Sequence, residues 1–201
     1  MATKTATHDL TKAWFRWVTA GEFAGFLAPA LAGALTSSPV LLVVAGIAEG
    51  AILGTAQALV LRRVLPKLKT AEWVGVTALA AGFAWAVAMV AVSNGARLAA
   101  LPLVVQLLIA AVAGTGVLLS IGIAQWLVLH HQVTGAHVWV WANAIAWGAG
   151  LIVFTAVTTP LWQPGQPPVL IALIGALGGL LMAATMAAIT GATLARLVKR
   201  S

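Results

Sequence analysis

Six long stretches of the chain consist almost entirely of apolar residues, and short polar segments separate them. Each stretch is close to the roughly 20 residues that an α-helix needs to cross a hydrocarbon core of about 30 Å. A transmembrane barrel would need alternating polar and apolar positions, which these stretches lack. The sequence therefore predicts an all-α integral membrane protein with six transmembrane helices. The expected spans are 13–36, 40–61, 73–93, 103–129, 138–157 and 169–195.

Residues typical of turns mark the breaks between these stretches. They occur at 37–39, Pro66, 94–95, 134–135 and 160–168. The last segment is rich in proline and forms the longest loop expected outside the membrane. The polar residues before the first span lack the apolar core and cleavage site of a signal peptide, so this span is expected to remain as an anchor.

Composition supports this class of protein. The chain of 201 residues is 62% hydrophobic and only 7% charged, whereas soluble domains carry about 25% charged residues. These values exclude a soluble enzyme, a disordered tail and a nucleic-acid-binding domain. The net charge of +7 rests on only eleven Lys and Arg residues, and the absence of cysteine excludes disulfides and thiolate sites.

The basic residues predict how the chain is oriented. Ten of the eleven Lys and Arg residues fall at one end of the expected helices, and Arg97 alone falls at the other. Because Lys and Arg accumulate in cytoplasmic loops, both termini are expected in the cytoplasm, with the protein in a cell (inner) membrane. Amphipathic rings favour the membrane interface, and five tryptophans are expected there: Trp14, Trp17, Trp73, Trp139 and Trp141.

The chain contains an internal repeat. The segment 54–63 matches the segment 122–131 at an offset of 68 residues, and a weaker third copy covers 191–200. The gapless alignment also pairs Gly46 with Gly114, Trp73 with Trp141, and Gly82 with Gly150.

This repeat predicts an arrangement of the helices. The repeated unit is a two-helix hairpin, with copies at about 13–63, 71–131 and 137–200. An even number of helices per unit gives every copy the same orientation, so a rotation about the membrane normal relates the copies. A pseudo-threefold bundle is the favoured architecture, and a stack of hairpins is the alternative.

The recurring pattern is G-x-x-Q-(W/A)-L-V-L, followed by two basic or histidine residues and a tryptophan that opens the next helix. It resembles a loose group of small, uncharacterised bacterial membrane proteins built from such hairpins. The resemblance covers nearly the whole chain and implies no established activity. The three-hairpin plan is also similar in shape to mitochondrial carriers, but their Pro-x-Asp/Glu-x-x-Lys/Arg signature is missing here.

Small residues recur on the even-numbered spans at intervals that place them on one helix face. In lipid, such residues let two helix backbones approach closely. The second copy has Leu118 within its stripe and is expected to pack less closely. The expected packing residues are Gly46, Gly50, Gly54, Gly114, Gly122, Ala183, Ala187 and Gly191.

Two carboxylic acids, Glu22 and Glu49, lie inside predicted spans. An acid in the membrane costs about 2.5–3.5 kcal/mol on insertion scales, so it indicates a functional site or a hydrogen-bonded link between helices. Both acids occur in the first copy alone; the alignment places Ala78 and Ala146 opposite Glu22. No Lys or Arg shares the depth of Glu49, which is therefore expected to face the interior and stay protonated.

Two glutamines, Gln57 and Gln125, occupy the same position in their repeats. A buried amide needs hydrogen-bond partners. We expect both glutamines to link helices, and a Glu22–Gln57 hydrogen bond would satisfy both of its members.

Three functions remain open. The favoured one is a non-enzymatic subunit or scaffold that contacts the lipid bilayer and packs as a homo-oligomer or within a larger membrane complex. The second is a small proton- or solute-coupled transporter that uses Glu22 and Glu49. The third, a haem- or pigment-binding protein, rests on His130, His137 and the tryptophans, of which Trp85 and Trp147 lie deeper in their spans. The weak candidates for a metal site are His130, His131 and His137. No catalytic motif is present, so an enzyme is not expected. A water-accessible cavity that touches both glutamates would favour the transporter, and a dry, fully packed centre would favour the scaffold.

Overall fold

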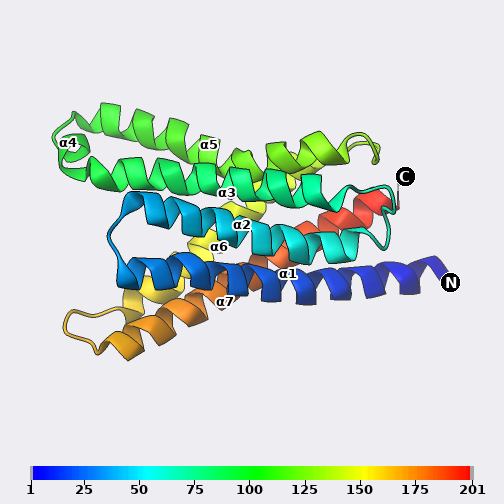
Figure 1. Cartoon of the computed structure of the whole chain (residues 1–201), viewed down its shortest axis with the longest axis horizontal. Coiled ribbons are helices and arrows are strands. Elements are labelled where there is room, and N and C mark those ends of the chain that lie inside the picture. The colour runs from blue at the N-terminus through cyan, green and yellow to red at the C-terminus, as the bar shows by residue number, and fades with distance from the viewer. Residues whose placement is uncertain (1, 200–201) are drawn as a thin grey trace.

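The computed structural model describes residues 2–199, and their side chains from His8 onward. All its regular elements are helices within this part of the chain, and six of them are long and apolar enough to cross a membrane (Figure 1). The short helix α4 lies at the bend between two of the long helices. The elements are α1 (Ala2–Leu35), α2 (Pro39–Leu61), α3 (Thr70–Ser93), α4 (Gly95–Ala99), α5 (Leu103–Leu129), α6 (Val138–Leu161) and α7 (Pro168–Val198).

The six long helices form a closed bundle in chain order. Each packs against its neighbours in the sequence, and α1 also packs against α7, which closes the circle. The two termini lie at one end of the bundle, and α4 lies at the opposite end with the connection from α6 to α7 (Figure 1). We call these the terminal end and the α4 end. Arg97 lies on α4; Arg200 falls outside the described residues.

Two helix limits differ from the sequence prediction by more than three residues. α1 begins at Ala2, well before the predicted start at residue 13, because polar residues can continue a helix beyond the apolar span. α6 continues through Pro160 to Leu161 instead of ending at residue 157. Turn residues act as expected elsewhere: α2 and α7 each have proline in their first turn, and Gly135 and Gly165 adopt positive φ angles of 73° and 83°.

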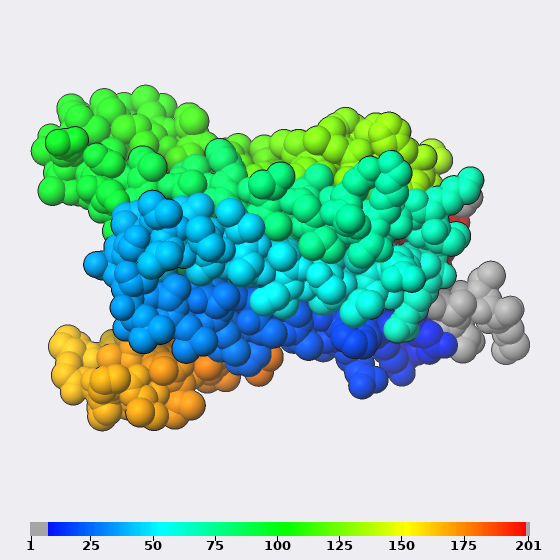
Figure 2. All heavy atoms as spheres, viewed as in Figure 1, coloured from blue at the N-terminus to red at the C-terminus, as the bar shows by residue number. Residues whose placement is uncertain are grey.

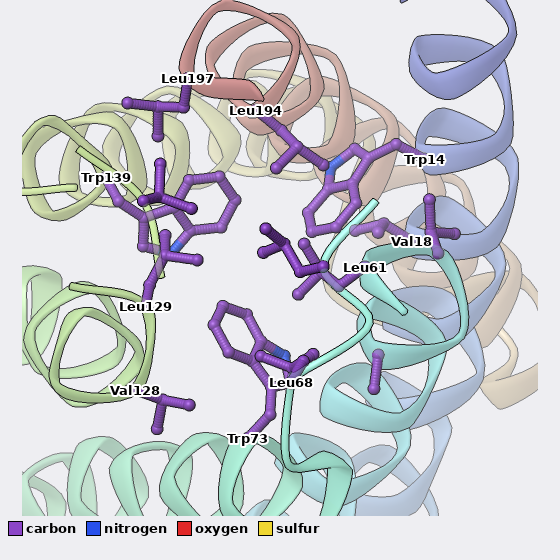
Figure 3. Close-up of a cluster of buried hydrophobic side chains, with 14 of the residues drawn as sticks. Trp14, Val18, Leu61, Leu68, Trp73, Val128, Leu129, Trp139, Leu194 and Leu197 are labelled. Carbon is purple, nitrogen blue, oxygen red and sulfur yellow. The ribbon is translucent and has the colours of Figure 1, made fainter. Parts of the chain in front are cut away.

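Three tryptophans form the centre of the main core, near the terminal end. Trp14, Trp73 and Trp139 are fully buried, and they point inward from α1, α3 and α6 (Figure 3). The ring of Trp139 lies 5.7 Å from that of Trp14 and 6.3 Å from that of Trp73, centroid to centroid. Leucines such as Leu61 and Leu129 fill the space around them.

The interfacial position predicted for these three tryptophans is therefore wrong. Of the five tryptophans expected at the interface, Trp17 and Trp141 are 45% and 62% exposed, as that prediction requires. A tryptophan near a helix end can lie at the lipid boundary or in the bundle centre, and the side of the helix on which it lies decides between them.

Glycines on α2 bring its backbone close to α3. A Cβ atom on Gly50 would lie 2.8 Å from the Thr77 carbonyl oxygen, and one on Gly54 would lie 3.1 Å from the Val74 Cα. On the later helices, a Cβ on Gly122 would lie 2.8 Å from the Val140 carbonyl oxygen of α6. Such positions accept no side chain without movement of the neighbouring backbone.

The remaining small residues divide into two groups. Ala183 and Ala187 are fully buried on α7, and Gly191 lies against the Trp14 ring. Gly114, in contrast, has no atom within 4 Å of an added Cβ. The predicted packing role of Gly114 is therefore wrong, because α5 presents that position to open space.

Candidate functional site

A cavity of about 250 Å³ lies inside the bundle, with walls contributed by all six long helices. Its lining is almost entirely apolar. The two acids that the sequence placed inside the spans, Glu22 from α1 and Glu49 from α2, both line it. The structure thus brings together two carboxyl groups that are 27 residues apart in the sequence.

Glu22 is completely buried. Neither of its carboxyl oxygens has a hydrogen-bond partner within the described part of the chain. A buried polar group without a partner costs free energy, so an unpartnered carboxyl group in a native structure calls for a specific explanation.

The predicted hydrogen bond from Glu22 to Gln57 is absent. Gln57 instead accepts hydrogen bonds from Trp73 and Gln125. Glu22 lies eight residues beyond Trp14 on α1, which at about 1.5 Å per residue places it some 12 Å deeper than the tryptophans. Counting residues from the edge of an apolar stretch does not show that Glu22 lies deeper than the polar layer that contains Gln57.

Glu49 is 6% exposed and has one close partner. The Trp85 Nε1 atom donates a hydrogen bond of 2.7 Å to its Oε2 atom. Two glycines make the arrangement possible: the Trp85 ring fills the space beside Gly46, and the backbone of Glu49 packs against Gly25. Glu49 thus faces the interior, where the sequence placed it, and no Lys, Arg or His lines the cavity.

A layer of polar side chains lies one helical turn from the cavity, toward the terminal end. Gln125 is at its centre: its Nε2 atom donates to Gln57 Oε1 at 2.7 Å and to Thr77 Oγ1 at 3.0 Å. Trp73 donates to Gln57 at 3.1 Å, and Trp139 donates to Gln125 at 2.9 Å. The glutamines therefore link helices, and with the tryptophans they separate the cavity from the terminal end.

The third tryptophan has a partner of another type. The Trp14 Nε1 atom donates to Thr190 Oγ1 on α7 at 2.9 Å. Each of the three buried indoles thus donates to a polar side chain on the second, fourth or sixth predicted span, which are α2, α5 and α7.

These contacts change the sequence alignment. Trp73 and Trp139 have equivalent partners and are 66 residues apart, two fewer than the offset between the glutamines. The predicted pairing of Trp73 with Trp141 is therefore wrong. Counted from the buried tryptophans, Glu22 corresponds to Ala81 and Trp147, which both line the cavity, and not to Ala78 and Ala146.

Two aromatic side chains of the cavity, Phe26 and Phe154, were missed at the sequence level, where Trp85 and Trp147 were considered only as lipid or pigment contacts. Phe26, Trp85, Trp147 and Phe154 line the cavity, and the rings of Phe26 and Phe154 meet edge to face at 6.1 Å. The spacing from the buried tryptophans could have identified part of the lining, because Phe26, Trp85 and Leu151 each lie twelve residues beyond one of them. Using this spacing requires knowing which tryptophans face inward.

The three candidate histidines lie apart from this cavity, near the terminal end. His130 stacks on Trp126 and contacts His131, and all three histidines are exposed. No group of three or more His, Cys, Asp or Glu side chains suited to a metal ion occurs among the described residues.

No family model matches the chain, and neither the curated proteins nor the solved structures contain a significant match to it.

Proposed function

We propose that the protein is a membrane transporter that couples movement of a small solute to protons through Glu22 and Glu49. One observation carries this proposal: both acids line one cavity inside the bundle. A carboxyl group inside a membrane span typically marks a solute or proton pathway. The cavity supplies a place where a solute would meet both acids.

The cavity argues against a purely structural role for the acids. A carboxyl group that only joined helices would be expected to bond to the neighbouring helix, as Gln57 and Gln125 do. Glu22 instead faces the cavity without a protein partner in the described chain. Its burial costs free energy that a structural role would not explain.

The proposal includes an orientation in a bacterial inner membrane. Among the described residues, the Lys and Arg residues other than Arg97 belong to the terminal end, which their distribution assigns to the cytoplasm. The tryptophan and glutamine layer then closes the cavity toward the cytoplasm. Three hairpins related by a pseudo-threefold rotation are part of the proposal, and the closed order of the helices supports them.

A second candidate is a subunit of a larger membrane complex, and the structure of α5 favours it. The buried residues of this helix begin only at Ile121, although the helix begins at Leu103. Its first half thus offers an apolar face to another helix or to lipid. Native mass spectrometry from a mild detergent distinguishes these cases, since a complex leaves a defined partner bound.

Transport is tested with the purified full chain in liposomes that contain a pH-sensitive dye. A panel of small aromatic cations, neutral molecules and anions is added outside, and the internal pH is followed. We expect at least one class to drive proton movement, and Glu22→Gln to abolish it. Glu72→Gln is the matched control, because Glu72 is exposed and pairs with Lys69 far from the cavity. If no class moves protons through the unsubstituted protein, the proposal is wrong.

A further inference from the structure

We propose that the cavity binds a small aromatic cation, whose positive charge takes the place of a proton on Glu22. This inference rests on the proposed transport function and names its class of solute. Four properties of the cavity support it: its charge, its aromatic walls, its size and the different surroundings of its two acids.

The charge of the cavity excludes an anion. Its only titratable lining groups are Glu22 and Glu49, and none of its lining residues is basic. An anion would meet either apolar surface or a group of its own sign. A neutral molecule without hydrogen-bonding groups would leave the Glu22 carboxyl group without a partner, whereas a cation supplies the charge that its carboxylate needs.

The walls suit a cation with an aromatic or alkylated body. Phe26, Trp85, Trp147 and Phe154 bring four rings to one cavity. A cation within about 6 Å of an aromatic ring gains about 0.5–1 kcal/mol at exposed sites and 2 or more when it is desolvated. Quaternary ammonium groups are recognised in proteins by such sets of aromatic rings.

The size of the cavity limits the ligand to one or two rings. A cavity of about 150 Å³ is enough to bind benzene, and pockets for drug-sized molecules begin at about 300 Å³. The cavity of about 250 Å³ lies between these limits. A bulky cation with four phenyl groups would not fit.

The two acids have different surroundings. Glu49 already accepts a hydrogen bond from Trp85, whereas Glu22 has no partner in the described chain. We therefore assign the direct contact with the cation to Glu22. The exchange is balanced: the protonated carboxyl group gives its proton to water, and the carboxylate that remains pairs with the cation.

The cavity reaches the surface on the side away from the three fully buried tryptophans, Trp14, Trp73 and Trp139. Leu151 of α6 lines it and is 44% exposed, and Ala88 of α3 lines it and is also exposed. These residues lie twelve and fifteen positions beyond Trp139 and Trp73. A ligand would therefore enter from the α4 half of the bundle, where apolar side chains surround the opening.

The test uses N-methylquinolinium, a two-ring cation, with the full chain in mild detergent. Binding is followed by the fluorescence of the cation, and proton release by a pH indicator in weak buffer. We expect about one proton released per cation bound, no proton release with quinoline, and no binding of naphthalenesulfonate at the same concentration. Glu22→Gln should weaken binding at least about tenfold and remove the proton release, and Glu72→Gln should change neither.

A second variant guards against a loss of folding in Glu22→Gln. Ala84 lines the cavity, so Ala84→Phe should fill it and block binding while both acids remain. Equal binding by the Ala84→Phe variant, or binding without proton release, overturns the inference.

Two results separate this inference from the proposed function. If N-methylquinolinium binds with proton release but does not cross liposome membranes, the transport proposal fails and the ligand class stands. If an anion or a neutral molecule drives Glu22-dependent proton movement instead, transport stands and the ligand class is wrong.

Discussion

Gln125 donates a hydrogen bond of 2.7 Å to Gln57, a residue 68 positions earlier in the chain. This separation equals the offset of the sequence repeat, in which the two glutamines are predicted to be equivalent. Residues related by a rotation can touch only where they lie close to its axis. The contact therefore supports the proposed arrangement of hairpins, whose axis would pass near the glutamines.

The two glutamines should be energetically coupled. Gln57→Leu and Gln125→Leu each remove one partner of the same hydrogen bond, so the double variant should lose less stability than the two single losses added together. Hydrogen bonds between membrane helices contribute about 0.6 kcal/mol on average and up to about 1.7. A double-mutant cycle of unfolding in detergent measures this coupling. Strict additivity would show that the bond contributes nothing.

Gly50 and Gly114 offer a matched pair of substitutions. Gly50→Leu should destabilise the protein by about 1–3 kcal/mol or more, because overpacking forces backbone shifts. A Cβ at Gly50 would lie 2.6 Å from the Ala81 Cβ, whereas one at Gly114 meets no atom within 4 Å. Gly114→Leu should therefore leave thermal stability unchanged. Equal melting temperatures for the two variants would refute the α2–α3 contact.

Glu49 should tolerate an amide but not a cation. In Glu49→Gln the new amide oxygen can still accept the Trp85 hydrogen bond, so insertion and thermal stability should be kept. Glu49→Lys places a positive charge among apolar walls and removes this acceptor. Its yield in the membrane fraction should fall sharply. A well-folded Glu49→Lys protein would mean that this position can reach water.

The orientation predicts the result of reporter fusions. Reporters that are active only in the cytoplasm should work at both termini and in the loops 62–69 and 130–137. The connection 162–167 should give the opposite result, because it lies at the α4 end. Positive charge retained on the cytoplasmic side is the physical reason. External activity at either terminal-end loop would reverse the assignment.

The sequence predicted the helices well because lipid and water impose different compositions on a backbone that must bond to itself. The predicted span 103–129 coincides with α5, and 40–61 differs from α2 by one residue. The interior position of Glu49 was also predictable, since a carboxyl group in a deep span avoids lipid.

What the sequence could not provide is the side of each helix that faces the centre. In a soluble protein the exposed face is polar, but here residues such as Leu79 and Ile152, each 70% exposed, are as apolar as the core. Trp73 and Trp141 therefore looked equivalent. The resulting errors in the repeat, three residues at Ala81 and one at Trp147, hid the relation of Glu22 to these two residues.

The three buried tryptophans give the closed end of the cavity an optical signal of its own. The rings of Trp14 and Trp139 lie 5.7 Å apart and are inclined at 82°. Electronic transitions of two indoles this close couple as excitons, and the coupling produces a circular dichroism signal. Any movement that opened this end would separate the rings and reduce the coupling. Circular dichroism can thus test, without an added label, whether this end opens during the proposed transport. Trp17→Phe should leave the signal intact because Trp17 points outward.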